Sequence, residues 1–370
     1  MYQEYMKINK GQISLSDKRN NLLFELKRGK GHFFPYLFNR IRWHFYPRVH
    51  HVSKFPDHID IEISSACNLR CPMCYTITDE FKEKIQVGLM DIELFKKLVD
   101  ECKEFKPYSI RISFRGEAFL HPNVFEMIEY AKKAGIKEVS SLTHGGMLNE
   151  EKFRKLIELE LDWLTISFDG LAEEYNKIRA PNNFDEQVEK IRRFSEIKKE
   201  LNVVKPLIKI QTISSAIENN AEDFYNTFSE ISDQIASNPL IDFSHTVIDE
   251  NFLENFTCPQ PWQRLVIGSD GKAMMCSMDE MGTYVVGDLN KESIHDVWHG
   301  KKMQNARKIH MKELGVKELP PCKWCIYPRK TNSKNVLVGD RVVSSYDYVN
   351  WDKTNTQNSE RYRKKLLKGD

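Results

Sequence analysis

The chain has 370 residues, 29% of them charged, and a formal net charge of only +2. That length suits two domains or one large core with an appendage, and the balanced charge gives no general attraction to nucleic acid. No segment reaches the roughly 18 uninterrupted apolar residues of a transmembrane helix. The first residues lack the apolar core of a signal peptide, so we expect a cytoplasmic protein whose eight cysteines are reduced ligands rather than disulfides.

Residues 1–56 form an extension that is rich in aromatic and basic side chains. The richest stretch runs from Phe33 to Arg48 and contains Phe, Tyr, Trp, Arg and His at close spacing. We expect a helix or loop that packs its aromatic side chains on the main domain and leaves the basic ones in water. The alternative is an amphipathic helix that contacts a membrane or an anionic partner.

From Asp57 onward the pattern alternates between strand and helix. Strands are expected at 59–63, 109–114, 139–142, 163–168 and 207–213, and helices at 91–102, 124–134, 150–160 and 184–200. Repeated βα units of this kind predict an α/β fold with a parallel sheet and helices outside it. Loops at the carboxyl ends of such strands carry the chemistry.

Three cysteines lie on the loop that follows the first of these strands. Cys67, Cys71 and Cys74 have the spacing C-x3-C-x2-C, which can hold three irons of a cubane cluster and leaves the fourth iron without a protein ligand. An open iron is a site for substrate or cofactor chemistry. The alternatives are part of a zinc site or plain buried thiols, but structural zinc is usually closed by four ligands in paired arrangements.

This cysteine spacing after a short strand resembles the signature of the radical S-adenosylmethionine (radical SAM) enzymes. The resemblance implies a partial (β/α)6 TIM-like barrel as the core, assigned to residues 57–250. It also implies that a [4Fe–4S] cluster on the three cysteines binds S-adenosylmethionine and cleaves it reductively to a 5′-deoxyadenosyl radical, which abstracts a substrate hydrogen. Met73 matches the apolar position that packs on the adenine in this family.

The later βα loops carry further matches to the same family. Gly116 and Glu117 resemble its Gly-Gly-Glu motif, which grips the amino group of the methionine moiety, although Arg115 replaces the first glycine. Thr143-His-Gly-Gly146 stands where the family often has Thr-Asn-Gly and is either a turn or a ligand neighbour. Ser167, in a Ser-x-Asp-Gly motif, is implied to contact the nucleoside or carboxylate. Arg179 is implied to bind the carboxylate of the methionine end, which suits its planar fork.

A second set of four cysteines follows: Cys258, Cys276, Cys322 and Cys325. Residues 265–276 predict a β-hairpin with its turn at Ser269–Gly271. This order resembles the SPASM/twitch extension of radical SAM enzymes, a small hairpin-plus-helix domain, assigned here to residues 251–330. Four cysteines imply one auxiliary [4Fe–4S] cluster with four protein ligands. A zinc ribbon is the alternative.

Three remaining features are assigned without a ligand role. Cys102 falls on a predicted helix and is expected to be a buried core residue. His245, near the sixth strand, faces either the pocket or the core. Residues 331–370 are expected to form a polar, flexible tail, with a short basic helix as an alternative.

A fully ligated auxiliary cluster suits electron transfer, so the expected reaction is oxidation or epimerisation of a sugar, aminocyclitol or sugar nucleotide. Epimerisation needs a second hydrogen donor, and the helix position of Cys102, the one spare cysteine, favours oxidation. A SPASM-type maturase acting on a peptide is the nearest alternative. An iron–sulfur activator or binding module without turnover is another. The expected partners are the small-molecule or peptide substrate and a reducing flavodoxin- or ferredoxin-type donor, without nucleic acid.

Overall fold

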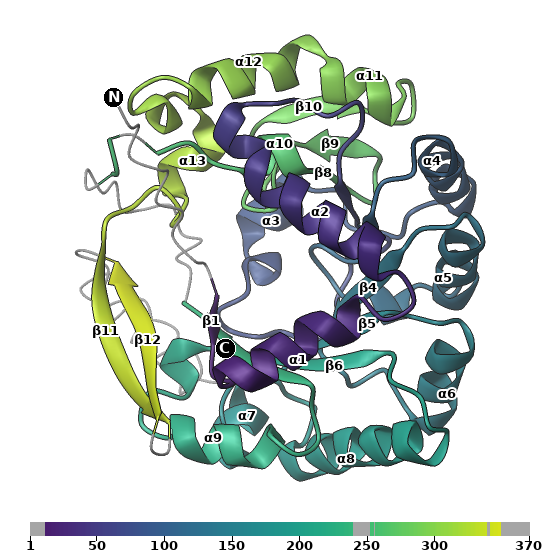
Figure 1. Ribbon diagram of the computed structural model, residues 1–370, viewed down its shortest axis with the longest axis vertical. Helices are drawn as coiled ribbons and strands as arrows, with labels where there is room; N and C mark the ends of the chain where they lie inside the picture. The colour runs from purple at the N-terminus through teal and green to yellow at the C-terminus, as the bar shows by residue number, and fades with distance from the viewer. Residues whose placement is uncertain (1–11, 240–251, 255, 339–340, 349–370) are drawn as a thin grey trace.

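The computed structural model describes residues 12–239, 252–254, 256–338 and 341–348 (Figure 1). Within them, ten strands form one sheet in the order β1-β7-β6-β5-β4-β3-β2-β8-β9-β10. Six neighbouring strands, β2 to β7, are mutually parallel and follow one another in chain order. They are β2 (His58–Ile61), β3 (Ser109–Arg111), β4 (Glu138–Thr143), β5 (Trp163–Ser167), β6 (Leu207–Ile213) and β7 (Gln234–Asn238). The predicted partial (β/α)6 barrel is confirmed.

Helices connect these strands and cover the outside of the barrel, as Figure 1 shows. They are α4 (Ile92–Phe105), α5 (Val124–Lys133), α6 (Glu150–Glu158), α7 (Ala172–Ile178), α8 (Phe184–Glu200) and α9 (Ala221–Phe228). Several begin at a side-chain cap: Asp91 accepts from the amides of Glu93 and Leu94, and Asn149 accepts from that of Lys152. Such caps satisfy amides that the first helical turn leaves without partners.

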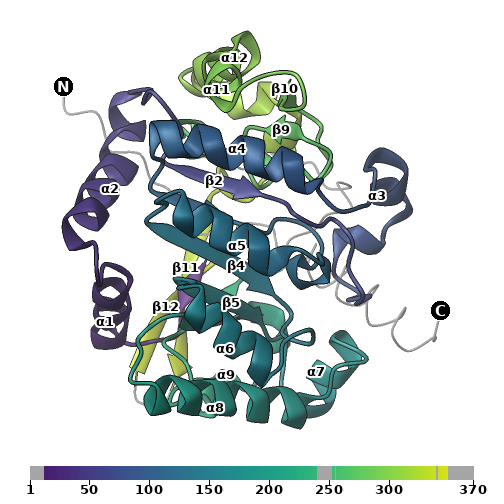
Figure 2. The same cartoon turned by 90° about the vertical axis from the view of Figure 1, so that its right-hand side faces the viewer.

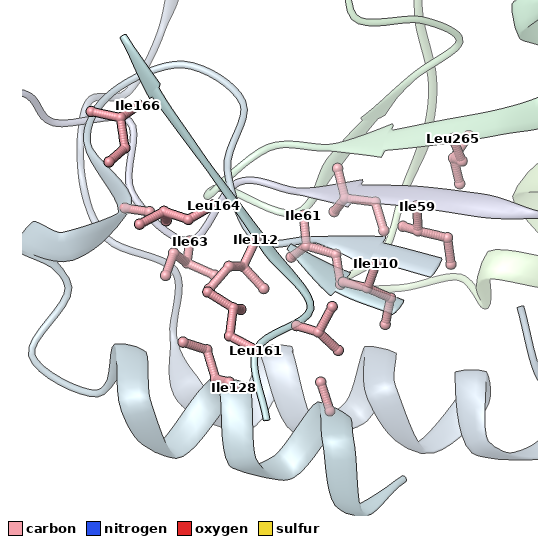
Figure 3. Close-up of a cluster of buried hydrophobic side chains, with 14 of the residues drawn as sticks. Ile59, Ile61, Ile63, Ile110, Ile112, Ile128, Leu161, Leu164, Ile166 and Leu265 are labelled. Atoms are coloured by element: carbon pink, nitrogen blue, oxygen red, sulfur yellow. The ribbon is translucent and has the colours of Figure 1, made fainter. Parts of the chain in front are cut away.

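The main apolar core lies between the barrel strands and these helices. Ile59, Ile61 and Ile63 alternate along β2 and its end, are fully buried, and share one cluster with Ile110 and Ile128. Figure 3 shows these side chains gathered between the strands and the helices. Because successive side chains of a strand point to opposite faces, the residues between them face the barrel interior. The buried Cys102 belongs to the same core, as expected.

The SPASM-like region continues the core sheet. Strand β8 (Arg264–Ile267) pairs in parallel with β2, and β9 (Lys272–Met274) and β10 (Val285–Asp288) follow antiparallel. The turn between β8 and β9 contains Gly271 at φ +81°, so the predicted hairpin is confirmed. Four helices complete the region: α10 (Gln260–Gln263), α11 (Ile294–His299), α12 (Lys301–His310) and α13 (Pro320–Trp324).

The N-terminal extension lies across the amino ends of the barrel strands. It comprises β1 (Ile13–Ser14), which pairs antiparallel with β7, and the helices α1 (Lys18–Arg28) and α2 (Phe33–Phe45). The expectation that its aromatic side chains pack on the main domain is confirmed for the buried Phe24 and Tyr36 and is wrong for Phe33, Phe34, Phe38 and Phe45, which are exposed. Ion pairs and the buried rings hold the opposite side of the two helices against the barrel.

The last described segment also differs from expectation. Residues assigned to a flexible tail begin with a hairpin of β11 (Thr331–Val338) and β12 (Arg341–Tyr348). The hairpin contacts α9 and β1, and Arg341 donates to the carbonyl of Leu15. Tertiary contacts of this kind order a segment whose polar composition alone predicts disorder. His245 and residues 349–370 lie outside the described residues.

Shorter elements join these parts. They are α3 (Asp79–Lys84) and the 3-10 helices η1 (Pro47–Val49), η2 (Tyr75–Ile77), η3 (Ala118–Leu120), η4 (Ser214–Ala216) and η5 (Gly315–Glu318). Among the described residues, no helix is both long and apolar enough to cross a membrane.

Candidate active site

Cys67, Cys71 and Cys74 lie together on the loop that leaves the carboxyl end of β2. None of them forms a disulfide. Burial raises the pKa of Cys71 to about 11, and the neighbouring Cys74 and Cys67 thiols add to the rise. Burial likewise raises the pKa of Cys67. Thiols with a raised pKa, such as those of Cys67 and Cys71, stay protonated near pH 7 and lose the proton when a metal cation binds the sulfur, as the thiolate ligands of an iron site do.

The second βα loop packs directly against the cysteine loop. Gly116 has φ +31°, and a Cβ there would lie 2.5 Å from the carbonyl oxygen of Ala66 and 2.6 Å from that of Ser64. The amide of Glu117 donates to the same Ala66 carbonyl at 2.8 Å. A side chain at position 116 would therefore push the two loops apart, which gives the predicted glycine a steric reason.

Glu117 is buried at the centre of this loop contact. Its carboxylate accepts hydrogen bonds from the Thr143 hydroxyl at 2.7 Å and from the amide of His144 at 2.9 Å. It also lies close enough to Cys67 to raise the pKa of that thiol. Each carboxylate oxygen has two acceptor positions, so the group can still accept from a bound amine.

His144 joins the third βα loop to the cysteine loop. Its Nε2 lies 2.8 Å from Oδ1 of Asn68 and 3.3 Å from the carboxylate of Glu117. Burial lowers its pKa, which favours the neutral ring. The sequence analysis left Thr143-His-Gly-Gly146 open between a turn and a ligand neighbour. In the structure this segment lies beside the predicted site. The contact is made by His144, to which the sequence analysis assigned no role.

Arg179 reaches the site from the end of α7. Its Nε and Nη2 atoms both donate to one oxygen of Asp169, at 2.9 Å and 2.5 Å, and the other oxygen accepts from the amide of Ile213. Burial alone would lower its pKa, but Asp169 and the nearby Cys71 raise it. Asp169 was not predicted as a site residue, yet it orients the arginine beside the cysteines.

The other two predicted cofactor contacts occupy less constrained positions. Ser167 is the last residue of β5, is buried, and pairs with Gln211 of β6. Met73 is half-buried on the cysteine loop between Cys71 and Cys74. The three cysteines, Glu117 and Arg179 thus converge at the carboxyl end of the barrel, with Ser167 and Met73 on the same loop and strand ends.

The second cysteine set lines one hollow in the SPASM-like region. Cys258, Cys276, Cys322 and Cys325 line this hollow together with apolar residues that include Phe256, Met275 and Val316. Burial raises the pKa of Cys258 to about 11. The pKa of Cys276 is raised more, because neighbouring thiols and Asp279 add to its burial. Four thiols around one apolar hollow fit an enclosed cluster.

His310, a residue without a predicted role, also lines this hollow. It is buried, and its Nε2 lies 3.7 Å from Sγ of Cys322. Burial lowers its pKa to about 4, so the ring is neutral near pH 7. In the described chain, its Nδ1 lacks a hydrogen-bond partner.

Among the described residues, no three His, Cys, Asp or Glu side chains are grouped tightly enough to hold one metal ion. A cubane does not require such a group, because each thiolate binds a different iron at a separate corner.

Arg115 connects the two cysteine regions. Its guanidinium binds the buried carboxylate of Glu62 through two hydrogen bonds of 2.6 Å and donates to the carbonyl of Glu280 at 3.2 Å. Glu62 also accepts from the amide of Ser269 in the β8–β9 turn. Arg115, which stands where the family has the first of two glycines, thus links the core to the SPASM-like region. The next residue, Gly116, keeps a positive φ.

Comparisons with known proteins agree with this arrangement. Residues 61–216 match the model of the radical SAM superfamily, and residues 258–326 match SPASM, an iron–sulfur cluster-binding domain. A cofactor-modifying protein for tungsten-containing aldehyde ferredoxin oxidoreductase from Pyrococcus furiosus is 31% identical over 155 residues, 41% of this chain. The match spans only 42% of that relative's length.

Solved structures show the same fold. BtrN in complex with AdoMet and 2-DOIA has a TM-score of 0.53 at 19% identity, covering 74% of this chain and 94% of BtrN. Native anSMEcpe with bound AdoMet and the Cp18Cys peptide has a TM-score of 0.53 at 16% identity, covering 85% of this chain and 99% of that one. Both matched domains are of the kind that holds iron–sulfur clusters: a SAM-binding [4Fe–4S] cluster in the core and an auxiliary cluster in the extension. The chain therefore belongs to the radical SAM superfamily and carries a SPASM domain after its radical SAM core.

Proposed function

We propose that this protein is a radical SAM dehydrogenase that oxidises a C–H bond next to oxygen or nitrogen in a sugar, aminocyclitol or sugar nucleotide. When bound, the cofactors would supply radical hydrogen abstraction at the three-cysteine site and an electron acceptor at the four-cysteine site. A flavodoxin- or ferredoxin-type donor would reduce the first site.

The observation that carries the proposal is the enclosed four-cysteine hollow. All four ligand positions there are thiols of this chain, so we assign Cys258, Cys276, Cys322 and Cys325 to an electron-transfer role rather than to substrate binding. An electron acceptor favours net oxidation over a redox-neutral rearrangement.

The remaining cysteine favours oxidation over epimerisation. The chain has eight cysteines, of which seven belong to the two sets. Cys102 is fully buried in the core between α4 and the sheet, and burial strongly raises its pKa. A thiol enclosed there has no path to a substrate in the barrel, so it does not suit the second hydrogen donor that an epimerase needs.

The chain's own residues would bind and orient the methionine end of the cofactor. We assign Glu117 to the amino group and Arg179 to the carboxylate. Asp169 occupies Nε and Nη2 of the arginine, which leaves Nη1 free to contribute to that contact. Gly116 keeps the second loop close to the cysteines, and Ser167 and Met73 are assigned to the nucleoside.

The barrel interior favours a polar substrate. On β6 the buried apolar Ile208 and Ile210 belong to the outer core, so Lys209 and Gln211 face inward. The ammonium group of Lys209 lies 5.6 Å from the centre of a Trp163 ring, and burial lowers its pKa to about 7. Lys209 donates to the side-chain oxygen of Gln12, and the Gln12 amide donates to Gln211, so the interior carries a hydrogen-bonded polar network. Such an interior suits a hydroxylated small molecule better than an apolar one.

Product analysis with reconstituted, reduced protein tests this proposal. Sugars, aminocyclitols, sugar nucleotides and peptides would each be added, and 5′-deoxyadenosine release would be measured. The expected result is stimulation by one polar small molecule, transfer of deuterium from that substrate, and a product lighter by two hydrogens. Cys322→Ala should still release 5′-deoxyadenosine without forming this product. Incorporation of solvent deuterium without a mass loss would instead indicate epimerisation, and absence of cleavage would indicate a non-catalytic module.

A peptide maturase is the second candidate, favoured by one surface feature. A cleft of about 800 Å³ lies between Lys84 and Ile85 after the cysteine loop, the β8–β9 turn and the start of α12. A cleft of this size can take an extended segment of several residues. Stimulation by peptides alone would favour this function.

A further inference from the structure

Helices α1 and α2 present their apolar side chains to the outside. Ten large apolar residues on this side are exposed, out of fifteen such residues in the described chain. We call them the apolar face: Leu22, Leu23, Leu26, Phe33, Phe34, Leu37, Phe38, Ile41, Phe45 and Val49. Phe34 is 70% exposed and Phe38 64%. Ten exposed large apolar side chains on two successive helices and the short η1 that follows them indicate an interaction site, because exposed apolar residues are otherwise scattered singly.

The opposite side of the same helices is anchored to the barrel by ion pairs and by the buried rings of Phe24 and Tyr36. Arg28 binds Glu138 at 2.9 Å, Arg42 binds Asp57 at 2.9 Å, and Lys27 binds Asp233 at 2.6 Å. These partners lie at or just before the amino ends of β4, β2 and β7. Because these contacts fix that side to the barrel, the helices cannot roll to bury their exposed phenylalanines without leaving the buried carboxylates of Glu138 and Asp57 unpaired.

The segment that carries the apolar face has a large excess of basic residues. Residues 17–51 contain eight Lys and Arg against two Asp and Glu, a net charge of +6, whereas the whole chain carries +2. The other residues therefore sum to −4. Lys18, Arg19 and Lys30 are exposed on the helices that carry the apolar face or on the turn between them.

We propose that the apolar face docks α1 and α2 onto the surface of a lipid bilayer that contains anionic lipids. Exposed aromatic and aliphatic side chains bordered by bases are the features of helices that lie in the interface, where bases attract anionic headgroups. A second copy of the chain fits less well, because pairing the two faces would bring two segments of +6 together. With 13 residues, α2 is about 20 Å long, shorter than the roughly 30 Å of the hydrocarbon core, so it lies in the plane of the surface.

This docking sets the direction in which the site opens. In Figure 2, α1 and α2 form one side of the molecule, whereas α3, which follows the cysteine loop, lies on the other. The bound enzyme would hold the amino end of the barrel against the lipid and open the cysteine loop toward the water. Its substrate would then arrive from the aqueous side.

Flotation of the full-length protein with vesicles tests the proposal. Vesicles of phosphatidylcholine alone would be compared with vesicles containing about one third phosphatidylglycerol. The wild-type protein should bind the anionic vesicles at least about tenfold better, and binding should weaken as salt is raised. Phe34→Glu with Phe38→Glu should reduce binding about tenfold or more, because charged groups replace the inserted rings.

Matched variants separate docking from folding. Val87→Glu alters an exposed apolar residue between α3 and α4, on the side of the molecule opposite to α1 and α2, and should leave binding unchanged. Reversal of Lys18, Arg19 and Lys30 to Glu leaves the apolar face intact and should remove the preference for anionic vesicles. All variants should keep the wild-type melting temperature and iron–sulfur absorbance.

Two outcomes would overturn the proposal. One is equal flotation of the wild type and the Phe34→Glu, Phe38→Glu variant. The other is a dimer in light scattering that this variant dissolves, without vesicle binding, which would assign the face to a second copy of the chain.

Discussion

The two cysteine sites of this protein have opposite surroundings. The first set comes from one loop of eight residues, is partly exposed, and stands beside Glu117 and Arg179. The second set comes from segments that span 258 to 325 and encloses an apolar hollow. A site that must admit a charged cofactor needs an open corner and polar partners, whereas a site that only exchanges electrons is best enclosed. The contrast supports the proposed division, in which the first site binds the cofactor and the second exchanges electrons.

Loss of the first set should have the largest effect on the chemistry. Replacing Cys67, Cys71 and Cys74 with Ala should remove about four irons per chain and abolish 5′-deoxyadenosine formation, because these three cysteines are the expected protein ligands of the first cluster. Iron analysis and product chromatography measure this. Cys102→Ala is the control and should keep full iron. Retained cleavage in the triple variant would remove the distinction between the sites.

Loss of the second cysteine set should leave the cleavage of S-adenosylmethionine unchanged but lower the stability of the fold. Cys322→Ala should lose about half the iron and lower the free energy of unfolding by on the order of 3 kcal/mol, since this cluster joins distant segments. The first set joins residues that are already neighbours, so its loss should affect stability less. Thermal melting of the two apo variants compares them. Equal melting temperatures would contradict this part of the comparison.

Close contact between loops is a property of the first site alone. Gly116→Ala should cost about 2 to 4 kcal/mol and weaken cofactor binding, because the new Cβ would meet two carbonyl oxygens at a positive φ. Gly135→Ala is a matched control with φ +86° and open space around it, and it should cost about 1 kcal/mol. Urea unfolding measures both, and equal costs would show that the loop contact is unimportant.

The polar partners of the first site should matter for affinity. Arg179→Lys should weaken S-adenosylmethionine binding by about tenfold, because an ammonium cannot hold Asp169 and a carboxylate in one plane. Calorimetry of the reconstituted protein measures the affinity. Glu151→Gln on the exposed side of α6 is the control. An unchanged affinity in Arg179→Lys would remove the arginine from the site.

The smallest expected effect concerns the enclosed site. His310→Phe removes a neutral ring nitrogen 3.7 Å from Cys322. If that nitrogen donates to a ligated sulfur, its loss should lower the potential of the auxiliary cluster by on the order of tens of millivolts. Potentiometric titration followed by electron paramagnetic resonance measures this, and the potential of the first cluster should not move. An unchanged auxiliary potential would limit His310 to packing.

The local parts of both sites could be predicted from the sequence. The spacing of Cys67, Cys71 and Cys74 needs only one loop, and the βα alternation needs only local periodicity. Gly116 and Glu117 were found because they follow a strand directly. Asp169, His144 and His310 were not assigned roles, because each acts through a residue outside its own motif: 10 positions away for Asp169, 12 for His310 and 76 for His144. Sequence patterns do not show which of these residues come into contact in the folded chain.

Residue spacing and periodicity were enough to predict the kind of protein: an α/β barrel with a set of three cysteines followed by a set of four. Tertiary structure alone decided which side of α2 faces water, since periodicity shows that a helix has two faces but not which partners each face meets. The same holds for the 331–348 hairpin, which α9 and β1 contact. Local propensity acts over a few residues, whereas burial and ion pairing depend on the surfaces that folding brings together.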